Sequence, residues 1–527
     1  MSRDDRLVLL GVLCLASGFV GIELMAVSVA LPSLVEDLAD WTQLRRASWV
    51  VNGYLLAYIA VMPLAGRAAD RFGLPRLLVI ALGLFGLGSL LSGAAGSLDT
   101  LVAARVVQGL GGGAILPLAT AGASQLFEGH ARARALGAVS ASNFLGMALG
   151  PFIGATVLEH FDLGPALVGA GLGGRLAFDL LVPAWRWIFY LGAPAALVAI
   201  AWTWAAASGW QRPSRPGSLD VTGAVLVTTA LTSGLVWLTT LGEQSGGLPV
   251  GLVALVACVA ATLAAVRHMR RTAEPFLDPI VFRDRVTRAA VLVSLLTGYA
   301  LATAIIAAAV WVDRVRYGGP SEQRLLLGAL ALAMAIGAIG SGYLLRRVSI
   351  VALGLVGLGF AIGGILLLGS ASADTARGVL LVGLAAFGLG FGLTVTPRST
   401  AAVESLGPRL YGMASAAVTV ARMAGMAVGL SVLTAFGTGR IETLSVVVTD
   451  QAARDAVLPP ELRGRPLADP LVVDVLETWA SAQAASILAG LFLVAALVLM
   501  AAIVPTLMLR LPTTAGGRAT MPGHEQP

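Results

Sequence analysis

The chain has 527 residues, of which 57% are hydrophobic and only 12% are charged, and its mean hydropathy is +0.86. About a quarter of the residues in a soluble protein are charged, and a soluble core stops growing at roughly 250–300 residues. The composition therefore disfavours a soluble multidomain protein and predicts a polytopic membrane protein. All 35 of the Lys+Arg residues are arginine. This excludes a Walker A phosphate loop, and with it ATP-driven pumping by this chain alone.

Windows of about 20 mostly apolar residues, long enough to span a bilayer, occur fourteen times along the chain. We therefore expect an all-α membrane protein with fourteen transmembrane helices. In chain order the windows cover residues 7–33, 47–66, 77–96, 100–126, 135–158, 186–206, 220–241, 249–266, 289–311, 323–344, 350–370, 377–397, 411–437 and 483–509. The first window carries Glu23 and is too long for the apolar region of a signal peptide, so we interpret it as a span.

The arginines are distributed unevenly between the two sides of the predicted membrane. With the N-terminus inside, 21 arginines fall in inner segments, 12 in outer segments, and Arg105 and Arg422 within spans. Because cytoplasmic loops carry an arginine excess, we expect both termini in the cytoplasm. The longest outer segment is 438–482, and its stretch 469–482 is predicted to be a helix that projects beyond the membrane and continues into the last span. A floppy hairpin is the alternative.

Two pairs of similar segments indicate an internal repeat. Residues 146–150 (GMALG) match 425–429 (GMAVG), and residues 66–73 (GRAADRFG) match 342–349 (GYLLRRVS) at Gly66/Gly342 and Arg71/Arg347. Two related halves around a site near the midplane are typical of secondary transporters. We expect an N-terminal six-helix bundle in 1–206, a linker with two extra helices and a basic cytoplasmic loop in 207–288, a C-terminal six-helix bundle in 289–510 that carries the extension 438–482, and a cytoplasmic tail in 511–527.

Three charged residues are placed deep in predicted spans: Glu23, Arg105 and Arg422. An intramembrane charge costs about 2.5–3.5 kcal/mol on insertion scales, so it marks either a functional site or a paired structural contact. Glu23 lies ~24 Å past the inner start of span one and Arg105 ~8 Å below the outer start of span four, which allows similar depths. One hypothesis is that Glu23 exchanges a proton while Arg105 biases its pKa. The alternative is a fixed ion pair that braces two helices.

Arg422 is placed ~17 Å into span thirteen, near the midplane. Its role stays open between contacting the substrate, pairing transiently with Glu23 and capping a polar cluster. No histidine is placed in a span and the cysteines are isolated, so the sequence predicts no metal site and no catalytic residues. A membrane-embedded enzyme is accordingly disfavoured.

Six motifs resemble those of the major facilitator superfamily in sequence and in order. Three look like its signature, proton-translocation and antiporter motifs: residues 66–73, 105–113 (RVVQGLGGG) and 146–155 (GMALGPFIGA). Three more are similar to motifs of its fourteen-span drug:proton antiporter branch: residues 23–32 (ELMAVSVALP), 49–54 (WVVNGY) and 185–189 (WRWIF). Residues 54–63 and 414–425 look like the actinobacterial multidrug and triacylglycerol exporters of that branch. Phe144 departs from those exporters, which carry an acid there.

The resemblance implies a proton-coupled exporter of lipophilic compounds, drugs or lipids. It would be a monomer in the bacterial cytoplasmic membrane, with no cofactor beyond the proton gradient and no nucleic acid partner. Glu23 and Arg105 would couple protons, and the central cavity would involve Asn52, Gln108, Asn143 and Arg422. The alternative is a lipid flippase without strict proton coupling, which works with an extracytoplasmic lipid-binding lipoprotein docked on 438–482.

The resemblance also assigns two structural motifs. Gly66, Asp70, Arg71 and Gly73 would form a conformational latch. In this latch Asp70 accepts hydrogen bonds at the N-terminus of span thirteen, where the helix dipole favours an anion. The antiporter motif holds the small residues Gly146, Gly150, Pro151 and Gly154, which allow helices to approach closely. They form either a dry contact between the two halves or ordinary close packing with a kink.

Overall fold

A computed structural model of the protein describes residues 2–510 except 39–43, 128, 162, 172–179, 211–219, 241–246, 274, 276–282, 346, 407–410, 439, 441–443, 445–446 and 448–449. These residues form helices and connecting turns, with no β-strand among them. Thirteen helices are long and apolar enough to cross a membrane, and the apolar part of one more, Trp49–Met62, is shorter. The expected all-α membrane fold is confirmed, whereas the exact count of fourteen spans is not.

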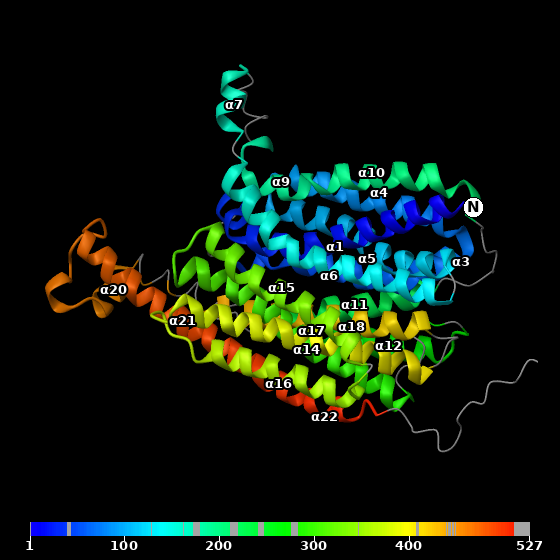
Figure 1. Ribbon diagram of the computed structural model, residues 1–527. Coiled ribbons are helices and arrows are strands. Elements are labelled where there is room, and N and C mark those ends of the chain that lie inside the picture. Colours follow the sequence, from blue (N-terminus) through cyan, green and yellow to red (C-terminus); the bar gives the residue numbers. More distant parts are fainter. Residues whose placement is uncertain are drawn as a thin grey trace, which may run out of the picture.

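The first group of long helices packs into one bundle (Figure 1). It contains α1 (Arg3–Leu38), α3 (Trp49–Phe72), α4 (Leu74–Gly93), α5 (Leu98–Leu126), α6 (Gly129–His160) and a sixth span made of two helices, α9 (Ala184–Tyr190) and α10 (Gly192–Ala206). Short helical segments accompany them: α2 (Leu44–Ala47), α7 (Gly164–Gly169) and η2 (Ala207–Gly209). The end of the bundle where α1 begins is called the near end, and the end where α1 finishes is called the far end.

Two further long helices, α11 (Val221–Thr240) and α12 (Gly247–Met269), pack against each other. Of this pair, α11 contacts both α3 of the first bundle and α18 (Tyr411–Val432), a helix of the second bundle, so it lies beside the junction of the two bundles. His268 at the end of α12 lies 2.6 Å from the buried Asp220 carboxylate just before α11. This contact ties the two ends of the pair together.

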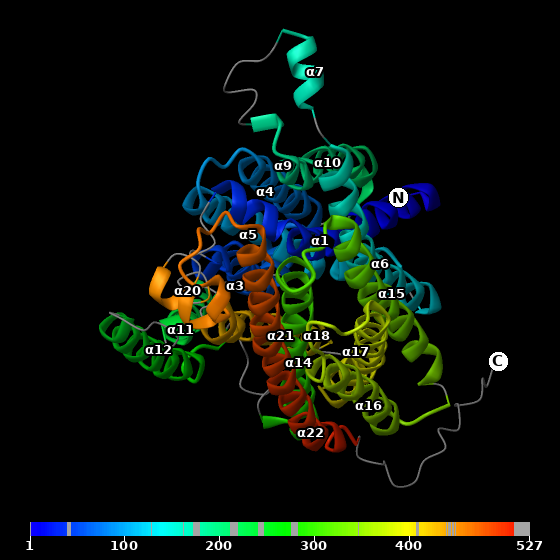
Figure 2. The same cartoon turned by 90° about the vertical axis from the view of Figure 1, so that its left-hand side faces the viewer.

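The second bundle follows α12. Its long helices are α14 (Arg285–Arg314), α15 (Pro320–Leu344), α16 (Ile350–Gly369), α17 (Arg377–Leu406), α18 (Tyr411–Val432) and α21 (Pro470–Ala501), and shorter segments are η4 (Leu433–Thr438), α20 (Gln451–Val457), η5 (Pro460–Leu462) and α22 (Ile503–Leu507). Asp469 caps α21 by accepting a hydrogen bond from the backbone N–H of Leu471. The expected helix over 469–482 is therefore confirmed. It projects with α20 beyond the far end of the bundle (Figure 1), the end that faces the viewer in Figure 2.

The two bundles share one packing pattern. α1 packs on α6 as α14 packs on α18, and α5 lies between α3 and α4 as α17 lies between α15 and α16. Glycines make the close contacts in both: Gly109 and Gly113 face α3 while Gly111 faces α4, and Gly388 and Gly392 face α15 while Gly390 faces α16. Because a side chain at any of them would meet a backbone, the spacing of small residues sets these helix contacts.

The antiporter-motif glycines pack within one bundle. A methyl group on Gly146 would lie 2.0 Å from the carbonyl oxygen of Gly18 on α1, and Gly150 and Gly154 face the same helix. The interpretation of these glycines as a contact between the two halves is therefore wrong, and close packing on α1 explains them. The contact between halves instead uses Phe152 of α6, whose ring lies against Gly328 of α15.

Polar contacts join the two bundles at the far end. The Nδ2 group of Asn52 on α3 donates to the hydroxyl of Ser431 on α18 at 3.2 Å. Arg324, near the start of α15, forms a 3.1 Å ion pair with Glu159, near the end of α6. These contacts hold the bundles together at the end from which α7 and α20 project.

Candidate functional site

Glu23 and Arg105 form a buried ion pair inside the first bundle. The Arg105 Nη1 donates to Glu23 Oε1 at 2.8 Å, and the side chains of Arg105 and Glu23 are 1% and 4% exposed. α1 and α5 bring the two residues to one depth, as the helix-rise arithmetic predicted. In a membrane interior such pairing offsets most of the cost of burying either charge.

The rest of the Arg105 guanidinium is also well contacted. Its Nε donates to the carbonyl oxygen of Val50 at 3.2 Å, and Nη1 also donates to Gln108 Oε1. The Gln108 Nε2 in turn donates to Ser89 Oγ of α4 at 2.8 Å. The Tyr54 ring of α3 stacks under the guanidinium, with 4.2 Å between Cζ and the ring centroid. One network thus joins α1, α3, α4 and α5, and any change at the ion pair acts on all four.

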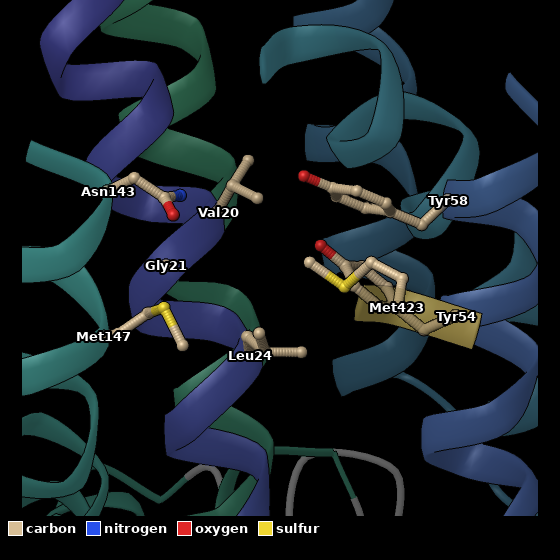
Figure 3. A pocket seen from close by; sticks show the side chains of 8 residues that line it. All are labelled: Val20, Gly21, Leu24, Tyr54, Tyr58, Asn143, Met147 and Met423. Atoms are coloured by element: carbon tan, nitrogen blue, oxygen red, sulfur yellow. The ribbon is translucent and has the colours of Figure 1, made fainter. Parts of the chain in front are cut away.

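A small cavity lies between the two bundles, close to this network, and the space between its atoms is about 270 Å³ when the part open to solvent is included. Its walls come from α1, α3, α6 and α18, and its lining residues are Val20, Gly21, Leu24, Tyr54, Tyr58, Asn143, Met147 and Met423. In Figure 3 the hydroxyl groups of both tyrosines point across the cavity toward α1. Tyr54 therefore forms the wall on one side and contacts Arg105 on the other. Its buried hydroxyl makes no hydrogen bond to any described residue.

The other expected cavity residues are placed differently. Asn143 lines the cavity and its Nδ2 donates to the carbonyl oxygen of Ser17 at 2.9 Å, which fixes α6 against α1. Asn52 lies at the far-end contact described above rather than in the cavity wall. Arg422 is buried on α18 and forms no ion pair with a described residue, Glu23 included. The structure thus brings Glu23, Arg105 and Gln108 together and leaves Arg422 apart.

Arg398 is a buried cation that the sequence reading assigned to an inner loop. α17 does not end at Pro397 but continues through it to Leu406, and Arg398 is only 1% exposed. Proline is tolerated inside membrane helices because neighbouring groups satisfy the freed backbone. Tyr54 and Tyr58 were also missed, although their spacing places both on one helix face.

The latch residues lie at the near end of α3 and just after it. The structure does not describe the side chains of Asp70 and Tyr411 or the surroundings of Gly66. The contact of Asp70 with the N-terminus of span thirteen therefore stays a prediction. Arg71 is exposed, and its guanidinium lies 5.3 Å from the centroid of the Phe72 ring. Gly73 separates α3 from α4 with φ of 88°, a conformation that favours glycine. A glycine is therefore required at this point of the motif for backbone reasons alone.

Comparisons with known proteins assign the family. The sequence model described as Major Facilitator Superfamily matches residues 13–430. A triacylglyceride transporter of Mycolicibacterium hassiacum is 35% identical over 409 residues, which cover 75% of this chain and 72% of that protein. One of Mycolicibacterium smegmatis is 33% identical over 457 residues, covering 83% of this chain and 77% of the relative. The triacylglyceride transporter of Mycobacterium tuberculosis is 30% identical over 436 residues, or 79% of each chain.

Solved structures agree on the fold. A bacterial homologue of the human lysosomal transporter Spinster, in an inward-facing and occupied conformation, aligns with a TM-score of 0.64 at 16% identity, over 97% of this chain and all of that one. A D-xylose–proton symporter aligns with a TM-score of 0.57 at 14% identity, over 94% and 97% of the two chains. The chain therefore belongs to the major facilitator superfamily. It is a multi-pass membrane transporter and not an enzyme.

Proposed function

We propose that the protein is a proton-coupled exporter of lipophilic, lipid-like compounds in the bacterial cytoplasmic membrane. The observation that carries this proposal is the buried Glu23–Arg105 pair, whose arginine contacts Tyr54, a residue that also lines the central cavity. The similarity to triacylglyceride transporters supports a lipid-like substrate. The arginine excess in the predicted inner loops supports cytoplasmic termini.

A proton on Glu23 would change the contacts of Arg105. Neutralising the carboxylate removes the charge that holds the guanidinium, which is left with Gln108, the Val50 carbonyl and the Tyr54 ring. Because Tyr54 also forms the cavity wall, protonation and substrate occupancy act on the same side chain. α3 also contacts α18 of the second bundle. Proton binding would thereby reach the junction at which the two bundles rock.

Alternating access needs the bundles to open at each end in turn. The Asn52–Ser431 and Glu159–Arg324 contacts hold the far end together, and their release would open it. At the near end, the proposed Asp70 latch on α18 would close the opposite side. We propose that residues 1–206 and 289–510 move as the two rocking units, with α11 and α12 as an inserted pair.

A second candidate is a lipid flippase without strict proton coupling. The observation that favours it is the helical extension formed by α20 and the start of α21, which projects beyond the far end (Figure 1). Such an element would dock an extracytoplasmic lipid-binding partner. In this reading the Glu23–Arg105 pair is a structural brace.

Transport by the purified protein in proteoliposomes separates the two candidates. We expect an imposed pH gradient to drive movement of a fluorescent triacylglycerol by the wild type and to have no effect on Glu23→Gln. The matched control is Glu404→Gln, which changes an exposed acid near the end of α17. Gradient-driven transport by Glu23→Gln at the wild-type rate would refute the proton role of Glu23. Wild-type transport that ignores the gradient would favour the flippase.

A further inference from the structure

Two buried arginines in the second bundle share one neighbourhood. Arg398 of α17 is 1% exposed and Arg422 of α18 is 8% exposed. Arg398 Nη1 contacts the hydroxyl of Thr297 on α14, and the next residue, Gly298, packs against the backbone of Arg422, so both arginines meet the same turn of α14. No described aspartate or glutamate lies within ion-pair distance of either group. The pair is thus a concentration of positive charge that the described side chains leave without a counter-charge.

The partners of these arginines are neutral. Arg398 Nη1 donates to the hydroxyl of Thr297 on α14, and its 3.5 Å contact to Thr394 also involves a hydroxyl. The Phe391 ring lies 5.1 Å from the Arg398 guanidinium carbon. The Nε atoms of both arginines are buried and make no hydrogen bond to any described residue. Contacts with hydroxyl groups and an aromatic ring do not offset the free-energy cost of burying two like charges. This cost favours binding of an anion between them.

The arginine pair adjoins the central cavity. Arg422 interacts electrostatically with Tyr58, and its neighbour Met423 lines the cavity together with that tyrosine. Arg422 thus lies next in the chain to a cavity-lining residue of α18, although neither arginine is itself part of the lining. No carboxylate lines the cavity. A ligand in this space would meet the hydroxyls of Tyr54 and Tyr58, and it would find no carboxylate among the described lining residues.

We propose that Arg398 and Arg422 form a binding site for a carboxylate or phosphate group. Guanidinium groups bind both anions through paired, charge-assisted hydrogen bonds, and their free Nε donors supply such geometry. The anion is either the headgroup of an amphiphile or a free inorganic ion. In the first case the site deepens the proposed export function, on which it then rests, by giving the substrate an acidic headgroup.

Equilibrium binding to the purified full-length protein in an uncharged detergent tests the site without transport. The probes are oleate, methyl oleate with the same chain and no charge, and inorganic phosphate. Charge-assisted hydrogen bonds predict that oleate binds about 10- to 100-fold more tightly than methyl oleate. Arg422→Gln and Arg398→Gln should remove this preference. Arg377→Gln, which changes an exposed arginine at the start of α17, should keep it.

The phosphate arm identifies the source of the anion. Phosphate that raises the melting temperature of the wild type but not of Arg422→Gln, without an oleate preference, supports a free inorganic ion. An oleate preference supports a headgroup. Equal binding of oleate and methyl oleate, with no phosphate effect on the wild type, overturns the site. Arg422→Lys keeps the charge and should retain part of the preference if the glutamine variants do not fold. Glu23→Gln should keep it in full, so a failure of proton coupling is distinguishable from a failure of this site.

Discussion

The two bundles have the same backbone frame but opposite electrostatics. When the glycines are matched by their contacts, Gly109 corresponds to Gly388 and Gly146 to Gly425. In this register Arg105 and Gln108 of α5 correspond to Leu384 and Phe387 of α17, and Asn143 of α6 corresponds to Arg422 of α18. The first bundle therefore has a charged network where the second has an apolar core. Conversely, the second bundle carries the cation Arg422 at the position where the first bundle carries the amide of Asn143.

This difference indicates a division of labour. In the first bundle the carboxylate of Glu23 neutralises the buried Arg105. Binding of one proton to Glu23 removes this neutralisation. In the second bundle Arg398 and Arg422 lack a described acidic partner, so neutralising their charge would need a bound ligand. The matched glycines give both bundles the same helix packing. A few residues that differ at matched positions give each bundle its own buried charges.

The largest expected loss of stability comes from breaking the Glu23–Arg105 ion pair. Arg105→Gln leaves Glu23 buried without its cation, and removing one partner of a buried pair costs about 3–5 kcal/mol. The melting temperature in detergent should therefore fall sharply. The double variant Glu23→Gln/Arg105→Gln should recover most of that loss, because no unpaired charge remains. A single variant as stable as the wild type would show that the pair is not a buried brace of the first bundle.

A smaller loss of stability is expected when the close glycine contacts that both bundles share are disturbed. A methyl group on Gly146 or Gly425 would lie 2.0 Å from a backbone carbonyl oxygen of the neighbouring helix. Overpacking of this kind costs about 1–3 kcal/mol, so Gly146→Ala and Gly425→Ala should lower the melting temperature alike. Gly137→Ala on the same helix as Gly146 meets nothing within 4 Å and is the control. Unequal losses at the two positions would contradict the matched packing of the halves.

Removing an uncompensated cation should cost nothing. Without anion, Arg422→Gln takes away a buried charge that lacks a described acidic partner, so its melting temperature should equal or exceed that of the wild type. This is opposite to the loss expected for Arg105→Gln. A clear loss for Arg422→Gln in anion-free buffer would mean that the two halves treat their arginines in the same way.

A loss of the size expected for a helix cap concerns the start of the second bundle. Burial acts to raise the pKa of Asp284, but hydrogen bonds from the Ser405 hydroxyl and the Thr287 N–H outweigh it and hold this pKa below its usual value. The stabilisation is present above the unfolded-state pKa of about 3.9 and is lost as the pH falls through the lower folded-state value. Asp284→Ala should cost about 0.5–2 kcal/mol at neutral pH and flatten the acid limb of the stability profile. An unchanged acid limb would argue against this cap.

Much of the arrangement of spans and their close contacts could be predicted from the sequence, because the length of an apolar stretch and the spacing of small residues are local properties. The Glu23–Arg105 contact was also accessible, since helix rise places residues at a depth. Three things were not accessible. Pro397 looked like a helix end, which hid Arg398; the partner helix of Gly146 depends on tertiary packing; and the cavity depends on which faces of α3 and α18 meet. Each needs the arrangement of helices in three dimensions.

The most direct test of the central claim is proton movement driven by substrate alone. Proteoliposomes with no imposed gradient receive a lipophilic substrate on one side, and a trapped pH dye reports the interior. The wild type should move protons against the direction of substrate movement, whereas Glu23→Gln should move substrate down its gradient without any proton flux. A proton flux in Glu23→Gln equal to that of the wild type would contradict the assignment of coupling to the first bundle.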